Sequence, residues 1–278
     1  MSSFKKNNNV LPKKYRQEKM ISDEIINFES FKNLNVSVCI HCANLEIFKE
    51  LLTYIQNFEL FEWNRLQIII NVVIDIVNYD EITSLIKNTF SNNRTHIIII
   101  KSENKGLDIG GFLRCLQYVK EDDHIVAKIH TKTDDKWREA MMKIFTKEGI
   151  YNSIKLLHFE KVGMVGNNNQ LWDIYKSTIT TEANKLSYKE QIIQICQIMK
   201  IPFNYIKLHQ SYLIGGTIFI CKKNILNDII KFKDKLYQYC NKADYYKNKL
   251  AFTFELTMER FFGYIVYHYN KEIVGLIS

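Results

Sequence analysis

Apolar runs rich in isoleucine and valine alternate with segments of helical periodicity through the first half of this 278-residue chain. The side chains at residues 36–40, 66–76, 96–100 and 125–129 are nearly continuously apolar, instead of alternating with polar ones. Strands buried on both faces show such runs, and helices between successive strands are typical of parallel connections. The sequence therefore predicts an α/β fold, Rossmann-like in outline, with a mostly parallel sheet flanked by helices.

Helical periodicity separates these strands, and the second half of the chain is richer in helices. In the first half the pattern predicts helices at residues 45–55, with Asn44 as the N-cap, and at 79–89 and 110–120. In the second half it predicts helices at 137–159 and 189–199 and again up to about residue 269, short strands at 162–165 and 212–221, and a polar, turn-like segment at 167–185 suited to a substrate-side loop.

Composition limits the classes of protein and of partner. Apolar residues make up 46% of the chain, enough for one catalytic-sized core. The net charge of +8 favours phosphate-bearing or other anionic partners. The basic residues are dispersed and form no recognised nucleic-acid motif, so we expect no nucleic-acid partner.

Targeting signals and covalent crosslinks are not indicated either. The six cysteines lie mostly in apolar segments and imply no disulfides. The first 17 residues are polar and basic, without the apolar stretch of a secretory signal, and no apolar run approaches the ~20 residues that span a bilayer. We therefore expect a cytoplasmic protein. Its basic N-terminus could make a peripheral contact with an anionic membrane.

Ligands of parallel sheets bind beyond the carboxyl ends of the strands. This rule selects residues 41–44, 75–78, 104–111 and 130–135. Three of the ten glycines lie within 106–111, between a strand and a helix, where the backbone can approach a phosphate or sugar closely. Their spacing is not that of a dinucleotide fingerprint, and a Walker loop is absent. Asp108 lies at the expected helix start, either as a helix cap or as a ligand contact.

The segment after the strand at 125–129 carries both charges and possible metal ligands. His130 and Lys132 could neutralise a diphosphate leaving group, which needs positive charge as its bond to the sugar breaks, although a solvated polar loop is the alternative. This segment could also bind a divalent cation, Mn²⁺ or Mg²⁺, with His130, Asp134 and Asp135 as possible ligands. The two aspartates are adjacent and do not form the alternating D-x-D pattern.

Two later motifs could complete a site. Gly215 and Gly216 interrupt a β-rich run, which indicates close approach of a ligand or simply tight packing. Glu255 and Glu259 lie four residues apart, hence on one helical face, in an aromatic setting. Such a carboxylate can serve as a general base, while a surface pair of glutamates is the alternative.

Five motifs, in order, resemble the rhamnan-synthesis-type glycosyltransferases over roughly residues 35–265. They are Asn104-x-Gly106-x-Asp108-Ile109, Ile129-His130-Thr131-Lys132 with Trp137, Gly163-Met164-Val165-Gly166, Gly216-Thr217-x-Phe219, and Glu259-Arg260. The resemblance implies a GT-A-like fold, in which a nucleotide-sugar-binding parallel sheet joins an acceptor half. It also implies a role in polysaccharide biosynthesis, with transfer of rhamnose or a related sugar.

The resemblance also implies roles for individual residues. Asp108 would contact the nucleoside or sugar of the donor, and His130 with Lys132 would stand where related enzymes carry the metal-binding D-x-D. Glu259, or failing that Glu255, would be the base, and Arg260 would support it or the diphosphate. The expected donor-binding set is Asn104, Gly106, Asp108, His130, Lys132, Gly216, Thr217 and Arg260. Asn167 and Ile220 depart from the family pattern, which leaves the acceptor specificity open. The missing D-x-D motif leaves the metal dependence open.

We therefore expect an inverting glycosyltransferase that uses a dTDP-, UDP- or GDP-linked donor and a glycan or lipid-linked hydroxyl acceptor. Residues 1–34 would be a basic arm and short helix, and 35–278 a single domain. Within that domain, residues 35–135 would bind the nucleotide sugar and 136–278 the acceptor. A non-catalytic nucleotide-sugar or glycan-binding module of the same fold is the alternative.

Overall fold

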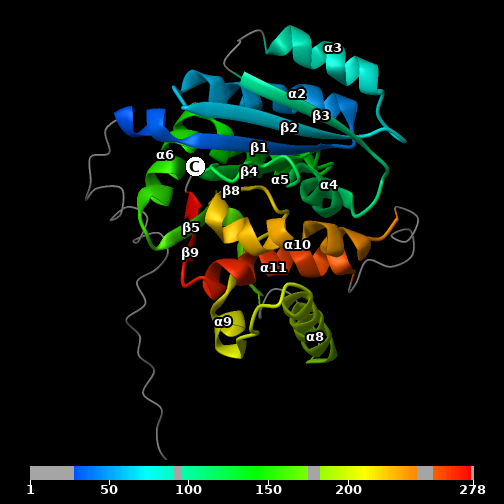
Figure 1. Cartoon of the computed structure of the whole chain (residues 1–278), viewed down its shortest axis with the longest axis vertical. Coiled ribbons are helices and arrows are strands. Elements are labelled where there is room, and N and C mark those ends of the chain that lie inside the picture. The colour runs from blue at the N-terminus through cyan, green and yellow to red at the C-terminus, as the bar shows by residue number, and fades with distance from the viewer. Residues whose placement is uncertain (1–27, 91–94, 175–181, 243–252, 277–278) are drawn as a thin grey trace, which may run out of the picture.

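The computed structural model describes residues 28–90, 95–174, 182–242 and 253–276, which are built around one central sheet (Figure 1). Seven strands of this part form the sheet, in the order β3-β2-β1-β4-β8-β5-β9. β1 pairs in parallel with β2 and β4, β2 with β3, and β5 with β9, whereas β8 is antiparallel to both of its neighbours. The expected α/β fold with a mostly parallel sheet is confirmed. The strands are β1 (Asn35–Cys42), β2 (Arg65–Val73), β3 (Thr95–Ser102), β4 (Ile125–His130), β5 (Val162–Asn167), β8 (Phe219–Lys222) and β9 (Glu272–Leu276).

Helices connect the strands, and two short antiparallel strands form a separate two-stranded sheet. The pair is β6 (Leu171–Asp173) with β7 (Tyr212–Ile214). The α-helices are α2 (Leu45–Gln56), α3 (Tyr79–Thr89), α4 (Leu107–Cys115), α5 (Asp135–Met142), α6 (Lys147–His158), α8 (Glu182–Ile198), α9 (Tyr205–Gln210), α10 (Asn227–Gln238) and α11 (Phe254–His268). The 3-10 helices are η1 (Phe28–Asn33), η2 (Asn57–Leu60), η3 (Lys143–Phe145), η4 (Asn168–Gln170) and η5 (Lys223–Leu226).

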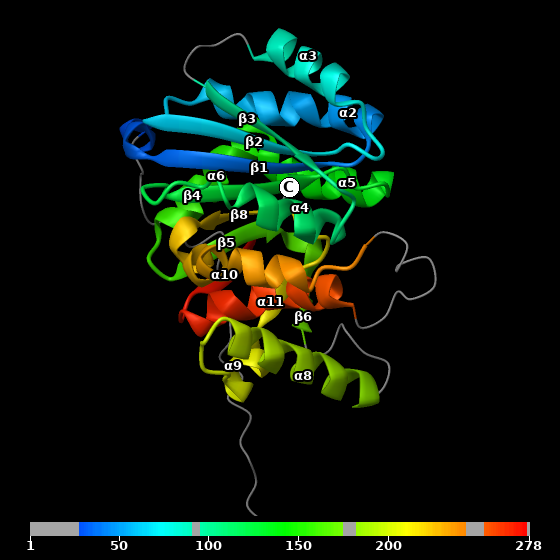
Figure 2. The ribbon, with the colours of Figure 1, turned by 45° about the vertical axis from the view of Figure 1, so that its right-hand side comes forward.

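Two hydrophobic clusters, one on each face of the sheet, explain the continuous apolar runs. In β1 the side chains of Val38 and Ile40 join the cluster that includes α2 and α6, while Cys39 joins the cluster of α4, α8, α10 and α11. Ile69 of β2 likewise faces the second cluster. Both views show α10 and α11 side by side, with α8 and α9 beyond them (Figures 1 and 2). The runs are therefore mostly apolar, because the side chains on both faces of the central strands pack against helices.

Several expected boundaries differ from the structure, each for a local reason. α4 begins at Leu107 and ends at Cys115, earlier than the expected 110–120 at both ends. The expected helix at 137–159 is divided, because Thr146 starts a new helix by accepting a hydrogen bond from the Gly149 amide. The expected strand at 212–221 is broken by a turn at residues 215–218 into β7 and β8, which belong to different sheets.

The polar segment expected at 167–185 contains the strand β6, and α8 begins within it at residue 182. Residues 175–181 lie outside the described part, as do residues 1–27 of the expected N-terminal arm. β9 has no counterpart among the expected strands. It completes the sheet at the edge beside β5.

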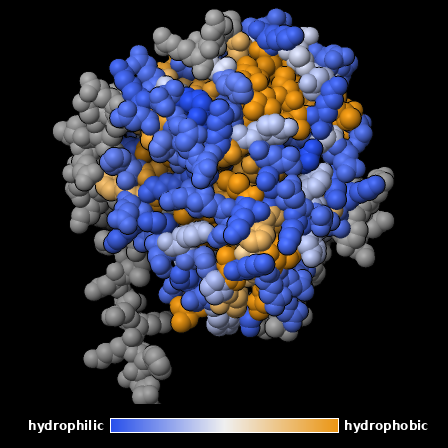
Figure 3. All heavy atoms as spheres, viewed as in Figure 1, coloured by the Kyte–Doolittle hydropathy of each residue, from blue (hydrophilic) through white to orange (hydrophobic). Residues whose placement is uncertain are grey.

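The helices and the surface of the described part show how its hydrophobic residues are distributed. No helix of the described ranges is long and apolar enough to cross a bilayer. On the face seen in Figure 3, hydrophilic residues predominate and hydrophobic ones appear as separate patches between them.

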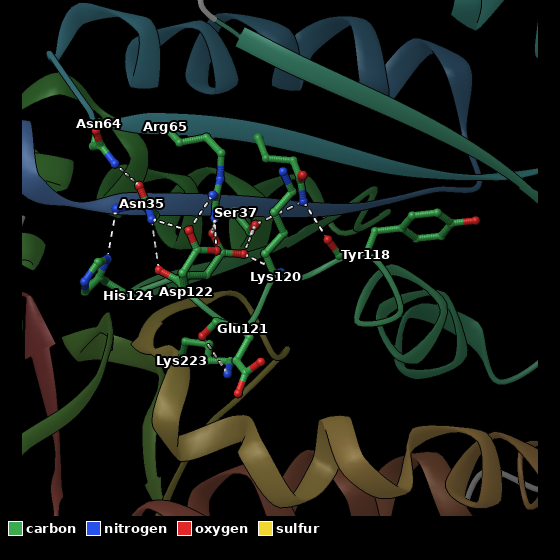
Figure 4. Close-up of polar contacts among 12 residues, drawn as sticks. Asn35, Ser37, Asn64, Arg65, Tyr118, Lys120, Glu121, Asp122, His124 and Lys223 are labelled. Atoms are coloured by element: carbon green, nitrogen blue, oxygen red, sulfur yellow. Dashed lines mark hydrogen bonds and ion pairs between the residues drawn. The ribbon is translucent and has the colours of Figure 1, made fainter.

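A polar cluster fixes the amino ends of β1, β2 and β4 (Figure 4). The Arg65 guanidinium donates hydrogen bonds to Asp122 and Asp123, all at 2.7 Å. Asp123 also accepts from the Ser37 hydroxyl at 2.7 Å and from the Lys120 amide at 2.8 Å. The Asp123 side chain is fully buried, whereas 61% of the Asp122 side chain is exposed. Asp123 therefore satisfies several buried donors, and Asp122 contributes a solvated ion pair.

We expect Asp123→Ala to destabilise the fold much more than Asp122→Ala. Removing Asp123 takes away the acceptor of the Ser37 hydroxyl and of the Lys120 amide and one of the two acceptors of Arg65 Nη2, which costs about 2–3 kcal/mol. Removing the exposed Asp122 loses mainly a screened surface pair. Urea unfolding of the two variants and the parent chain measures the difference. Equal losses would show that burial of Asp123 does not matter.

Candidate active site

The carboxyl ends of the central strands bring together the segments that the sequence selected. His41 of β1 lies in register with His130 of β4. The Ala43 amide donates to the Thr131 hydroxyl at 3.0 Å, which joins the segments 41–44 and 130–135. The Asn104 amide donates to Asp75 at 3.0 Å, which joins 75–78 and 104–111. α4 and the first turn of α11 lie at this same end of the sheet, on the right in Figure 1.

A buried ion pair between Asp108 and Lys128 is the centre of this region. The Lys128 Nζ lies 2.6 Å from Asp108 Oδ2, 2.7 Å from Thr217 Oγ1 and 3.1 Å from the Thr217 carbonyl oxygen. The Thr217 hydroxyl in turn donates to Asp108 Oδ2 at 2.6 Å. Only 1% of the Lys128 side chain is exposed. Three acceptors around one nitrogen match the three donors of a protonated ammonium group, so the pair is ionic.

Electrostatics keep Asp108 ionised in spite of its position. Burial would raise the pKa of the Asp108 carboxyl, but the charges of Lys128 and His130 and the hydrogen bonds from Lys128 and Thr217 hold this pKa well below its usual range. Burial lowers the pKa of Lys128, and Asp108 opposes that effect. Asp108 is not the cap of α4, because the N-cap position belongs to Gly106, in the left-handed region with φ 75°. Asp108 is a partner in the buried ion pair, and its contact with a ligand stays a prediction.

The turn between β7 and β8 is held in a strained conformation against this pair. Gly216 has φ 80° and Thr217 has φ 53°, a left-handed value that a β-branched residue rarely adopts. His130 Nε2 lies 2.7 Å from the Gly216 carbonyl oxygen, and the Gly216 amide donates to Glu259 Oε1 at 2.6 Å. Strain of ~1–3 kcal/mol persists only where surrounding contacts enforce it, and such strain concentrates at functional sites.

His130 serves this turn as a neutral imidazole. Burial lowers the pKa of His130 to about 4, and Lys128 acts in the same direction, against the opposing effect of Asp108. At neutral pH the imidazole therefore carries no charge, and its Nε2–H donates to the Gly216 carbonyl. The expectation that His130 neutralises a diphosphate does not fit this state, because a neutral ring supplies no positive charge. Lys132 remains as the cationic residue of that segment.

The two glutamates of α11 differ in what they contact. Glu255 accepts hydrogen bonds from the backbone and side-chain amides of Asn241 with both carboxylate oxygens, so it anchors the chain before α11. Glu259 uses Oε1 for the Gly216 amide, while Oε2 lies 3.9 Å from Arg260. Burial raises the pKa of Glu259, and the Gly216 amide and Arg260 offset part of this rise. Glu259 therefore has the environment of a proton acceptor, and Glu255 that of a structural anchor.

A cavity of about 190 Å³ opens over the ion pair. Asp108, His130, Lys132 and Glu259 supply its polar and charged lining, together with Gly216, Thr217, Thr253, Glu255 and the apolar residues Leu107, Ile109 and Leu256. Larger hollows of about 590 and 640 Å³ are lined by the residues around the amino ends of the strands. We assign the site to the smaller cavity because the buried charges converge there, at the carboxyl ends, where parallel sheets bind ligands.

Three members of the expected donor-binding set lie elsewhere. Arg260 packs its guanidinium 4.2 Å from the Tyr188 ring and donates to the Leu256 carbonyl, and it does not line the cavity. Asn104 and Gly106 do not line it either. Gly106 instead shapes the start of α4, where a Cβ would lie 2.6 Å from the Cys240 sulfur.

The possible metal ligands are not arranged as a metal site. Asp134 caps α5 by accepting from the Trp137 amide, and Asp135 pairs with Arg138 at 2.9 Å. Asp108 already has the Lys128 ammonium beside it. Among the described residues, no group of three or more His, Cys, Asp or Glu could hold a metal ion. These residues therefore do not fit a cation bound by protein ligands alone.

Sequence reasoning missed Lys128 and a second polar chain beneath α4. His41 Nδ1 lies 3.1 Å from Asn71 Oδ1, and Asn71 donates to the Ser102 hydroxyl at 2.6 Å. A Cβ on Gly111 would lie 2.0 Å from His41, so this glycine lets α4 approach the sheet. The available signal was a lysine in the middle of an apolar strand, since a buried lysine requires a partner.

Comparisons with known proteins leave the family open. No family model matches the chain, and no curated protein matches it. A mannosyltransferase from Pyrobaculum calidifontis, solved with GDP-Man and Mn²⁺, is 10% identical with a TM-score of 0.48, over 95% of this chain and 61% of its own. A 4-diphosphocytidyl-2C-methyl-D-erythritol synthase from Anaerococcus prevotii is 12% identical with a TM-score of 0.41, over 88% of this chain and 89% of its own.

The chain thus spans less than two thirds of the mannosyltransferase. Both TM-scores are below 0.5, so neither likeness bears on activity, and the resemblance to rhamnan-synthesis enzymes stays a prediction.

The neutral state of His130 predicts a specific acid sensitivity. Histidine in an unfolded chain titrates near pH 6.5. In the folded chain His130 titrates at about 4. Between these values the unfolded state binds the proton and the folded state does not, so the free energy of unfolding falls as the pH falls, by ~1.4 kcal/mol per unit. His130→Gln, which can donate to Gly216 without titrating, should show a shallower decline when urea unfolding is measured from pH 7 to 4. Parallel curves for the two proteins would show that His130 titrates normally.

Proposed function

We propose that this chain is a glycosyltransferase that moves a sugar from a nucleotide-sugar donor to a hydroxyl acceptor. The observation that most supports this proposal is that Glu259 and Lys132 line the same cavity, which opens over the buried Asp108–Lys128 ion pair. Transfer of a glycosyl group needs a base for the acceptor and a cation for the departing diphosphate, and this cavity offers one of each. The GT-A-like fold family and the rhamnose-type sugar rest on the sequence resemblance alone.

The reaction follows from the chemistry of these two side chains. Glu259 takes the proton of the acceptor hydroxyl, and the acceptor oxygen forms a bond to the anomeric carbon. The bond from that carbon to the phosphate oxygen breaks, and its electron pair leaves with the nucleoside diphosphate, whose charge Lys132 stabilises. Attack from the face opposite the diphosphate inverts the anomeric configuration.

The donor fits the cavity only in part. Cavities that enclose a whole drug-sized ligand measure ~300–1,000 Å³. At about 190 Å³, this one suits the reacting sugar and the adjoining phosphate. Asp108, with 22% of its side chain exposed, is placed to accept hydrogen bonds from sugar hydroxyls. We propose that the nucleoside lies over the carboxyl ends of the strands in residues 35–135, and that residues 136–278 contribute the acceptor side.

A fixed cation is built into the site. The Lys128 ammonium lies 2.6 Å from Asp108. Asp108 therefore differs from a free carboxylate ready to bind a metal, and Lys132 is the group proposed to face the phosphate. We therefore propose transfer that does not depend on a divalent cation.

Glu259→Gln should lower turnover by ~10²- to 10⁴-fold, because the amide cannot accept the proton of the acceptor. The amide oxygen can still accept the Gly216 hydrogen bond, so donor binding should survive. In the parent enzyme the acid limb of kcat/KM should lie above the usual range of a glutamate, because burial raises the pKa of Glu259. Rates of nucleoside-diphosphate release across a pH series measure both effects.

Glu255→Gln is the matched control, since this residue lies on the same face of α11 and anchors Asn241. It should lower stability more than turnover. Thermal shifts with UDP-, dTDP- and GDP-sugars, with EDTA or with Mn²⁺ or Mg²⁺, report binding, because ligand at 100 times its Kd adds ~2.7 kcal/mol of apparent stability. Near-normal turnover by Glu259→Gln would refute the base assignment. Absence of any shift across the donors would refute the donor site, and binding without transfer would favour the binding-module alternative.

A further inference from the structure

Two of the three tryptophans of the chain lie beside the strained turn at Gly216. The ring centroids of Trp137 and Trp172 are 5.5 Å apart, at an interplanar angle of 39°. Trp137 belongs to α5, and Trp172 to β6, within the segment where the sequence predicts a substrate-side loop. The pair therefore joins two elements that lead into the proposed site.

Trp172 is packed on one side and open on another. A Cβ on Gly215 would lie 3.0–3.2 Å from three atoms of its six-membered ring, so the indole rests against the Gly215 backbone. The Gly215 amide donates to the Gln170 carbonyl at 2.8 Å, which extends the β6–β7 pairing to this point. Yet 38% of Trp172 remains exposed. Tryptophan is buried in most settings, so a rigidly held and exposed indole is typical of a binding surface.

Contacts connect the two indoles to the catalytic groups proposed above. Gly216, next to Gly215 in the chain, donates its amide to Glu259 at 2.6 Å. A Cβ on Gly216 would lie 3.5 Å from the Trp137 ring. The Lys132 Nζ lies 4.2 Å from the centroid of that same ring. The turn therefore contacts both tryptophans and Glu259.

We infer that Trp172, with Trp137 behind it, forms the acceptor subsite, and that its occupant is a pyranose ring stacked on the exposed indole. Sugar rings present a flat C–H face that packs on aromatic rings, while their hydroxyls point outward from the rim. The Gly215–Gly216 turn, which lies against Trp172 and donates its Gly216 amide to Glu259, connects this subsite to the proposed base. This inference rests on the proposed function, because it names the acceptor class of the same site as glycans.

Kinetics of two variants test the subsite. Trp172→Ala should raise the KM for a glycan acceptor about tenfold, with the donor KM nearly unchanged, because it removes acceptor binding alone. Trp172→Phe keeps an aromatic face and should recover most of the loss. Thermal unfolding of both variants monitors the β6–β7 pair. Equal acceptor KM values in all three proteins, or equal harm from both substitutions together with equal loss of stability, would overturn the inference.

Fluorescence tests the same surface without turnover. Trp63 is the tryptophan away from this pair, packed among Phe31, Phe58 and Phe61, so Trp63→Phe leaves Trp137 and Trp172 as the reporters. Methyl glycosides and disaccharides of glucose, galactose, mannose and rhamnose are the probes. Saturable quenching in Trp63→Phe that disappears on adding Trp172→Ala supports the subsite, and no quenching across the panel overturns it. Donor thermal shifts decide the proposed function separately, since they need no acceptor.

Discussion

The ion pair between Asp108 and Lys128 is the interaction on which the rest of the site depends. It joins the first turn of α4 to the middle of β4, and through Thr217 it fixes the turn that leads into β8. Two charges buried this deeply are tolerated only when each is fully hydrogen-bonded. The pair therefore specifies where three distant segments meet, and it gives the floor of the cavity its shape and fixed charge.

The same environment pushes two carboxyl groups in opposite directions. Lys128 holds the pKa of Asp108 low, whereas burial raises the pKa of Glu259. Glu259 accepts a hydrogen bond from the Gly216 amide of the turn. Carboxyl groups whose pKa values are separated in this way commonly have separate roles in catalysis. This separation is one reason for our proposal that Asp108 holds a ligand and Glu259 accepts a proton. His130 is neutral, so it supports the turn through its hydrogen bond to Gly216 and adds no charge to the site.

Sequence patterns predicted the parallel strands β1 to β4 because nearly continuous apolar runs mark them, whereas the short edge strand β9 was not predicted. The predictable part of the site followed from one rule, that functional segments come after parallel strands. Other features depended on contacts between distant residues. The sequence leaves Asp108 open as a helix cap or a ligand contact and does not predict its ion pair with Lys128. The segment 212–221 is predicted as one strand, which the turn at Gly216 divides into β7 and β8. Arg260 follows Glu259 in the chain, yet its guanidinium packs against Tyr188.

If this cavity transfers a sugar with Glu259 as the base, the anomeric configuration of the product is inverted relative to the donor. Purified protein would be incubated with anomerically ¹³C-labelled nucleotide sugars and glycan acceptors, and the new glycosidic carbon followed by NMR. We expect transfer with inverted configuration, in EDTA as well as in Mn²⁺. Retention of configuration, or no transfer and no donor cleavage with any of the UDP-, dTDP- and GDP-linked sugars, would contradict it.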